Sequence, residues 1–172
     1  MIIKLQHSKL QVLVGPNGSG KTTLVTNFVK KNKGVFLGFQ KPVAVPGVTY
    51  NEFLRAASKT KLGPLEFYQF LKKQAKVLKI PDEFLVKDLN SELSGGEKKK
   101  MELFQALVLK PKFAIFDEPD SGVDSKNKKL LVRGLGQLLH NGTGVLVITH
   151  DLKFLKPLKI YKAYKMKNGR LS

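Results

Sequence analysis

Gly15-Pro16-Asn17-Gly18-Ser19-Gly20-Lys21-Thr22 is the stretch that decides the fold, because it joins a short apolar run to a segment with helical spacing. The run Leu10–Val14 before it has the length and apolar character of a buried parallel strand. The segment 22–31 after it places apolar residues on one helical face and ends at Asn32-Lys33-Gly34. This order of strand, glycine-rich loop and helix predicts a loop whose backbone N–H groups converge on phosphate oxygens.

The residues of this loop predict a nucleotide bound together with magnesium. Glycine permits the backbone angles and the close approach to phosphate that a side chain would block. Lys21 is expected to reach the β- and γ-phosphates, and the Thr22 hydroxyl is expected to ligate Mg²⁺. The residues expected to contact the nucleotide are Gly15, Pro16, Asn17, Gly18, Ser19, Gly20, Lys21, Thr22 and Thr23.

Two acidic residues follow the apolar run Phe113–Phe116, which predicts a second buried strand. Asp117 would lie at the carboxyl end of that strand, the edge at which open α/β sheets bind ligands. We expect Asp117 to support Mg²⁺ and Glu118 to act as the general base for an attacking water. Glu118 alone would be better explained as a surface carboxylate, but its position beside Asp117 and the phosphate loop favours catalysis.

Polar side chains also end two other apolar runs. His150 follows 145–149, and Gln40 follows 35–39. Taken alone, each is better explained as an ordinary polar residue at a strand end. Together with the other motifs, His150 is a candidate catalytic residue that could meet the γ-phosphate. Gln40 is a candidate both for orienting water and for contacting the metal.

Leu93-Ser94-Gly95-Gly96-Glu97 predicts a second helix N-terminus suited to an anion, in a chain with only one phosphate loop. It could be a simple N-cap followed by flexible glycines. It could instead clamp the γ-phosphate of a second copy, so that two subunits dock head to tail and complete each other's sites. On that interpretation Ser94, Gly95, Gly96 and Glu97 contact nucleotide across a homodimer, and one subunit alone hydrolyses it poorly.

Strands alternating with helices predict an α/β fold with a mostly parallel sheet covered on both faces. Helices are expected over 51–62, 65–80, 97–109 and 125–140, a short one at 81–84, and another capped by Asp151. Further strands are expected over 35–39, 144–149 and 160–166, and an extended linker over 42–47. We therefore predict a single domain with a core lobe at about 1–45 and 107–172 and an inserted helical lobe at about 46–106.

Composition narrows the classes of function. The net charge is +18, but the 31 basic residues include only three arginines, Arg55, Arg133 and Arg170. Hydrogen bonding to base edges and bidentate contacts to phosphate favour arginine. A solvated lysine surface therefore explains the charge better than a nucleic-acid site does. The chain has no cysteine, which excludes disulfides and thiolate ligation of an iron–sulfur cluster. No apolar stretch approaches the roughly 20 residues of a membrane span, and no signal peptide is evident, which predicts a cytoplasmic protein.

These motifs resemble those of the ATP-binding-cassette ATPases over nearly the whole chain. In that family's terms Gly15–Thr22 is similar to Walker A, Gln40 to the Q-loop and Leu93–Glu97 to the signature. Phe113–Glu118 is similar to Walker B, 121–124 to the D-loop and His150 to the switch histidine. The resemblance implies a P-loop core with an inserted helical signature lobe, ATP and Mg²⁺ as cofactors, and a nucleotide contact from Asp124.

A narrower resemblance is to the ATPase subunit of the SUF iron–sulfur cluster assembly system. It rests on the stretches 40–48, 51–57, 94–100 and 117–124. It implies ATP-driven rearrangement of soluble scaffold subunits that hold the cluster, which fits a chain without cysteine. A nucleotide-binding subunit of a membrane transporter is the alternative, with the same chemistry and contact to the membrane only through its partner. A DNA-repair or chromosome-type cassette is disfavoured because 41–92 lacks sustained heptads.

The chain departs from the cassette pattern in one region. Lys21 and Gln40 are only 19 residues apart, and only nine residues precede Leu10. Cassette ATPases carry an antiparallel β-lobe here, with an aromatic residue that stacks on adenine. We therefore expect that lobe to be largely missing. No aromatic residue precedes Gly15, so a preference for ATP over GTP is implied by the resemblance alone.

Overall fold

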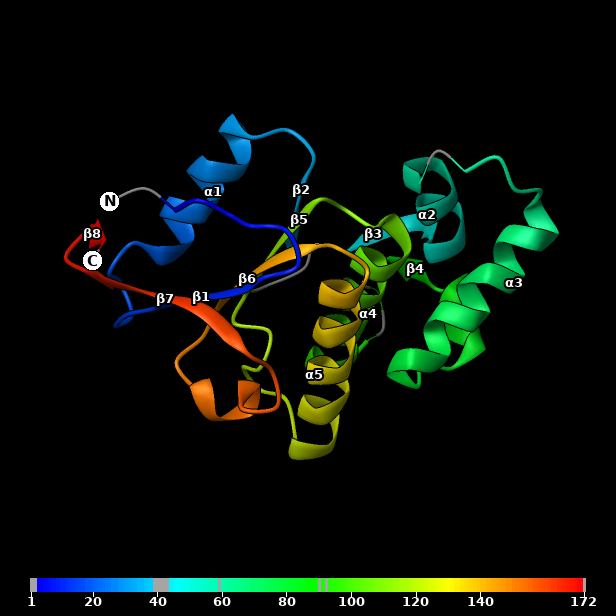
Figure 1. Cartoon of the computed structure of the whole chain (residues 1–172). Coiled ribbons are helices and arrows are strands. Elements are labelled where there is room, and N and C mark those ends of the chain that lie inside the picture. The colour runs from blue at the N-terminus through cyan, green and yellow to red at the C-terminus, as the bar shows by residue number, and fades with distance from the viewer. Residues whose placement is uncertain (1–2, 39–43, 59, 90, 92, 172) are drawn as a thin grey trace.

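The computed structural model describes residues 3–38, 44–58, 60–89, 91 and 93–171. Its centre is a six-stranded sheet in the order β2-β5-β6-β1-β7-β8 (Figure 1). The first five of these strands run parallel, and β8 pairs antiparallel with β7. The strands are β1 Leu10–Val14, β2 Val35–Gly38, β5 Phe113–Asp117, β6 Gly144–Ile148, β7 Ile160–Lys167 and β8 Arg170–Leu171. The predicted α/β class with a mostly parallel sheet is confirmed.

Helices cover the two faces of the sheet unequally (Figure 1). α1 (Lys21–Lys31) lies on one face, where its apolar residues pack against a small cluster with Leu13, Ile115 and Ile148. α4 (Gly95–Leu109) and α5 (Ser125–His140) lie on the other. The larger cluster there joins Val12, Val145 and Val147 of the sheet to both helices. Most of the apolar burial is therefore on the α4/α5 side.

The inserted helical segment lies beyond α4. It contains α2 (Tyr50–Ser58) and α3 (Pro64–Ala75), followed by two 3-10 helices, η1 (Lys76–Leu78) and η2 (Asp82–Val86). Its buried side chains, including Tyr50, Leu71 and Phe84, belong to the same cluster as those of α4 and the sheet. The segment thus shares a continuous core with the sheet. The lobe boundaries given above remain a prediction.

Several predicted boundaries were wrong. The helices expected over 51–62 and 65–80 end at Ser58 and Ala75, the second continuing as 3-10 turns. Lys79 adopts a left-handed conformation (φ 50°) that ends regular helix. The expected linker 42–47 contains the start of a strand, β3 (Val45–Thr49), which pairs antiparallel with β4 (Asp88–Leu89). Phe113–Asp117 and Ser125–His140 agree with prediction.

The connection from α1 to β2 shows how short the chain is on the α1 face. Only Asn32, Lys33 and Gly34 separate the two elements, and Gly34 turns with a φ of 81°. Residues 3–9 form no strand. Within the described residues, β3 and β4 form the only sheet besides the central one, so the expected shortening of the β-lobe agrees with the structure. None of the helices in the described part of the chain is long and apolar enough to cross a bilayer.

Candidate active site

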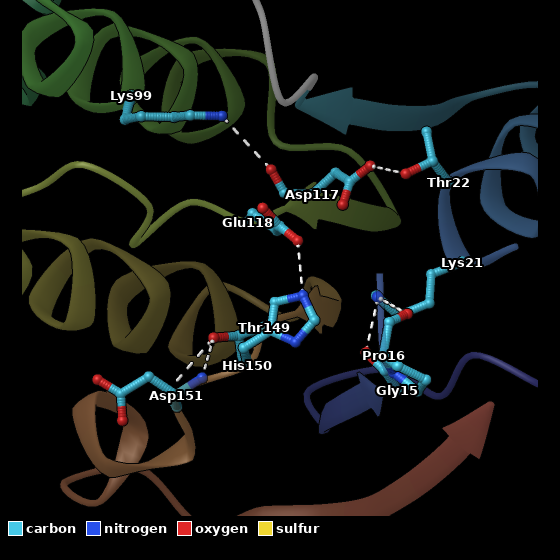
Figure 2. Close-up of polar contacts among 10 residues, drawn as sticks. All are labelled: Gly15, Pro16, Lys21, Thr22, Lys99, Asp117, Glu118, Thr149, His150 and Asp151. Atoms are coloured by element: carbon cyan, nitrogen blue, oxygen red, sulfur yellow. Dashed lines mark hydrogen bonds and ion pairs between the residues drawn. The ribbon is translucent and has the colours of Figure 1, made fainter. Parts of the chain in front are cut away.

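The phosphate loop lies between β1 and α1 at the carboxyl edge of the parallel strands (Figure 2). Gly18 and Gly20 have positive φ, 73° and 96°, which side-chain-bearing residues rarely adopt. A Cβ on Gly15 would lie 2.3 Å from the Met166 carbonyl oxygen, so only glycine fits where β7 passes behind the loop. The Gly169 N–H donates to the Ser19 carbonyl at 3.1 Å, which anchors the loop to the β7–β8 turn.

The loop lines a polar pocket of about 340 Å³. Its walls are Asn17, Gly18, Gly20, Lys21, Thr22, Thr23 and Glu118. The Lys21 ammonium donates to the carbonyl oxygens of Gly15 at 2.8 Å and of Pro16 at 3.0 Å (Figure 2). A phosphate group has stronger acceptors than these carbonyls and would draw the ammonium away from them. The pocket therefore fits a phosphate chain, with Lys21 already beside it.

Thr22 and Asp117 meet across the edge of the sheet. The Thr22 hydroxyl, at the start of α1, donates to Asp117 Oδ2 at 2.7 Å (Figure 2). Burial raises the pKa of the Asp117 carboxyl; the Thr22 hydrogen bond opposes that shift. A hydroxyl and a carboxylate this close are hard oxygen ligands of the kind that Mg²⁺ prefers. The two residues expected to hold the metal are thus adjacent, and the donor set fits it.

Glu118 is held in an unusual backbone conformation. Its φ is 50°, which is uncommon for a residue with a side chain and is often found at functional sites. Its N–H donates to the Ile148 carbonyl at 2.9 Å, so the turn is fixed to the end of β6. The conformation directs the carboxylate to the phosphate pocket, whose wall it forms.

His150 follows β6 and contacts Glu118 directly. Its Nε2 lies 2.9 Å from Glu118 Oε1, and the pair is drawn in Figure 2. For this contact to be a hydrogen bond, Nε2 carries the proton and donates it to the carboxylate. The imidazole is therefore placed to orient the Glu118 carboxylate. The sequence predicted that both residues follow strands of the sheet, but it did not predict that they touch.

The other predicted site residues lie elsewhere or outside the described residues. Gln40 falls in 39–43, which the structure does not describe. Ser94 and Glu97 form a reciprocal cap at the start of α4: the Ser94 N–H donates to Glu97 Oε2 at 2.8 Å, and Ser94 Oγ accepts from the Glu97 N–H at 3.3 Å. Asp124 caps α5 by accepting the N–H groups of Lys126 and Asn127, each at 2.9 Å. None of Ser94, Gly95, Gly96, Glu97 and Asp124 lines the phosphate pocket of its own chain, so their nucleotide contacts remain a prediction for a second copy.

Lys99 is a buried residue that the sequence analysis did not assign to the site. Its ammonium lies 3.7 Å from Glu102 Oε2 on the same helix and donates to the Asp117 carbonyl at 3.4 Å. Burial lowers the pKa of Lys99, and the nearby carboxylates oppose this shift. The i,i+3 spacing of Lys99 and Glu102, which places both on one helix face, was the signal that could have been used. α4 is thereby tied to the strand that carries the acidic pair.

A family model described as "ABC transporter" matches residues 1–121. A relative from Cyanophora paradoxa, named "Probable ATP-dependent transporter ycf16", is 33% identical over 203 residues, covering 98% of this chain and 78% of the relative. The chain belongs to the ATP-binding-cassette family. ATP with Mg²⁺ is accordingly the cofactor pair that its phosphate loop and acidic residues fit.

Other proteins are similar to this chain in sequence or in fold. A "Probable ABC transporter ATP-binding protein" from Streptococcus pyogenes is 29% identical over 201 residues, covering 98% of this chain and 78% of its own. A solved "ATP binding subunit of ABC transporter" superposes with a TM-score of 0.82 at 21% identity, covering 98% of this chain and 79% of that one. A dimeric cassette "bound to ADP and Pi" superposes with a TM-score of 0.81 at 19% sequence identity, covering 99% of this chain and 87% of that one. These structures confirm the cassette fold.

The alignment with the Cyanophora relative also shows that this cassette is short. It runs over 203 positions, although the present chain has 172 residues in all. The relative therefore carries residues for which this chain has no counterpart.

Proposed function

We propose that this cassette hydrolyses ATP and uses the energy to rearrange a soluble SUF-type scaffold on which iron–sulfur clusters are assembled. The observation that carries the hydrolytic part is the convergence of Lys21, Thr22, Asp117, Glu118 and His150 at one edge of the sheet. These five side chains come from the ends of two strands, β5 and β6, and from the start of α1, and they supply the positioning and charge stabilisation on which phosphoryl transfer to water depends.

Each of these residues has a distinct task. Backbone N–H groups of the loop and the Lys21 ammonium hold the phosphates and neutralise charge that develops on them. The Glu118 carboxylate accepts a proton from the attacking water while the bond between the γ-phosphorus and the bridging oxygen breaks and ADP leaves. His150, 2.9 Å from that carboxylate, keeps it turned towards the water. Thr22 and Asp117 would hold Mg²⁺, which when bound would neutralise charge on the phosphate oxygens.

One chain does not contain a complete site on this account. The exposed N-terminus of α4, with Ser94 and the two glycines, is a second anion-binding terminus with no phosphate of its own to hold. Two copies related head to tail would each place this terminus over the other's phosphate loop. ATP-dependent dimerisation is therefore part of the proposal, and a dimeric cassette among the similar structures supports it.

The scaffold assignment is supported by the SUF-like stretches and by the chemistry of the chain. Residues 94–100, one of those stretches, include Lys99, whose ammonium reaches the Asp117 carbonyl behind the catalytic pair. The chain has no cysteine with which to ligate a cluster, so any cluster belongs to the partner. A cytoplasmic location belongs to the same proposal.

A membrane transporter is the second candidate, because the names of the relatives favour it. Both relatives described above are named as transporter components. The hydrolytic chemistry would be unchanged, and the partner would be an integral membrane permease. The two candidates differ only in what the cassette moves.

Affinity capture separates these candidates. The Glu118→Gln variant is expected to bind ATP without turning it over and so to remain in its ATP-bound assembly. Captured with Mg-ATP from its native cells and analysed by mass spectrometry, it should bring down cysteine-bearing scaffold subunits, whereas wild type incubated with ADP should bring down less. Recovery of a permease instead would assign the cassette to transport.

A further inference from the structure

A large groove lies on the α1 side of the sheet, away from the phosphate pocket. It has a volume of about 960 Å³ and is bounded by the N-terminal segment 3–5, the end of α1 with the turn after it, and the starts of β2 and β5. The phosphate pocket lies at the carboxyl ends of the parallel strands, whereas Val35 and Phe113 begin theirs. The groove is therefore at the opposite edge of the sheet from the phosphate pocket.

The floor of the groove is apolar and incompletely covered. Leu5, Phe28 and Val35 line it and are only partly buried, although they pack against the smaller core cluster. Ile3, which also lines it, is buried. When a partner covers apolar surface gathered in a concave site, the burial of that surface favours binding. The groove adjoins the end of α1, where a connection of only three residues leads to β2.

The rim of the groove carries positive charge without a compensating acid. Lys4, Lys31, Lys33 and Lys112 line it, and no acidic residue does. All four are exposed. No ion pair involving any of them occurs among the described residues. Four unpaired ammonium groups around an apolar floor match a segment that carries acidic residues beside apolar ones.

The edge of the sheet adds a feature suited to an extended segment. β2 is the first strand of the sheet and, among the described strands, pairs only with β5. Its outer N–H and C=O groups are thus left without a neighbouring strand. Val35, the first residue of β2, also lines the groove. A segment lying in the groove would reach this edge at one end, where main-chain hydrogen bonds could add to its affinity.

We propose that this groove docks an acidic, apolar protein segment of a partner. A second copy of the chain is a poor occupant of this groove, because a chain with 13 acidic and 31 basic residues has few segments that would offer carboxylates to the lysine rim. A bilayer meets convex or flat surfaces better than a concave one, and nucleic-acid sites favour arginine, which is absent from the residues that line this groove. The proposal does not depend on what the cassette moves, and it places a contact surface far from the nucleotide.

The test uses a defined probe: a short fluorescein-labelled peptide in which Glu and Leu alternate, measured by fluorescence anisotropy with the full chain at physiological salt. One control peptide has Lys in place of Glu, and a second has Ser in place of Leu. Hydrogen–deuterium exchange then locates the bound peptide. The Glu/Leu peptide should bind more tightly than both controls and should protect 3–5, 28–35 and 112–113 from exchange.

Matched variants decide whether the groove is responsible. Lys31→Glu with Lys33→Glu reverses two rim charges, and Lys73→Glu with Lys76→Glu reverses two exposed charges at the end of α3 that do not line the groove. The first pair should weaken binding by about fivefold or more, since each attraction becomes a repulsion. The second should leave it within about twofold. Leu5→Ser tests the floor and should also weaken binding; if it does not fold, the two lysine pairs decide alone.

The proposal is overturned if the two charge-reversal pairs weaken binding equally, because the attraction would then be non-specific. It is also overturned if the Ser-containing peptide binds as well as the Glu/Leu peptide. Single-stranded DNA or anionic phospholipid vesicles that protect the same segments more strongly than the peptide would assign the groove to another class of partner. ATP hydrolysis by the rim variants should equal that of wild type, so failure here leaves the proposed hydrolysis untouched.

Discussion

The Thr22–Asp117 hydrogen bond allows a prediction with a magnitude. Thr22→Val replaces the hydroxyl by a methyl group of similar size and leaves the carboxylate of Asp117, which is only 4% exposed, without its 2.7 Å donor. Hydrogen bonds to charged groups contribute about 1.5–3 kcal/mol, and removing one partner leaves the other with its desolvation penalty. We expect the nucleotide-free variant to lose stability of this size, or about 3–12 °C in Tm for a domain of this length.

The assay is thermal and urea unfolding without nucleotide, followed by circular dichroism. Thr22→Ser keeps the hydroxyl and should stay close to wild type. Thr23→Val is the matched control, because Thr23 is the adjacent, exposed residue and makes no hydrogen bond through its side chain in the described structure. If Thr22→Val unfolds at the same temperature as Thr23→Val, the hydroxyl does not hold the carboxylate, and the reasoning for a preformed metal site fails.

Three further predictions test other parts of the structure. Gly144→Ala should destabilise by about 1–3 kcal/mol in urea unfolding, because its Cβ would lie 2.2 Å from the Gln6 carbonyl oxygen; Gly136→Ala, whose Cβ would meet only a side chain at 3.4 Å, should be neutral or stabilising. Glu97 has a lowered pKa because it accepts hydrogen bonds from Ser94, so its stabilising effect is present above its unfolded pKa and lost as pH falls through its folded one. Glu97→Gln should therefore flatten the acid limb of stability against pH, and an unchanged limb would contradict the cap. Ser94→Arg should abolish hydrolysis but leave nucleotide affinity of the monomer intact in equilibrium titration; equal loss of both would argue against action across a dimer.

The sequence predicted the site best where chemistry and strand position coincide. Asp117 and Glu118 follow four apolar residues, and the phosphate loop follows another apolar run, so a parallel sheet had to bring both to its carboxyl edge. The contact between His150 and Glu118 could not be predicted in this way. It depends on β5 and β6 being neighbours and on the positive φ of Glu118, neither of which leaves a local pattern.

Segments governed by tertiary contacts were predicted less well. β3 and β4 are 39 residues apart from Thr49 to Asp88 in the register, and a pairing of that separation leaves no periodic signal within either short segment. The packing of β7 behind the phosphate loop was missed for the same reason, because the close approach of Gly15 to the Met166 carbonyl joins segments far apart in the sequence. The net charge was attributed to solvated lysines in general, yet Lys99 is buried beside Glu102.

The central claim is that Glu118 is the base of an ATP hydrolase whose turnover serves a scaffold. Phosphate release from Mg-ATP should be measured for wild type and Glu118→Gln, alone and with a purified SUF-type scaffold complex. We predict slow release by wild type, faster release when the scaffold is present, and loss of both in Glu118→Gln with ATP binding retained. Equal phosphate release by wild type and Glu118→Gln would contradict the assigned base, and wild-type release that the scaffold leaves unchanged would contradict the assigned task.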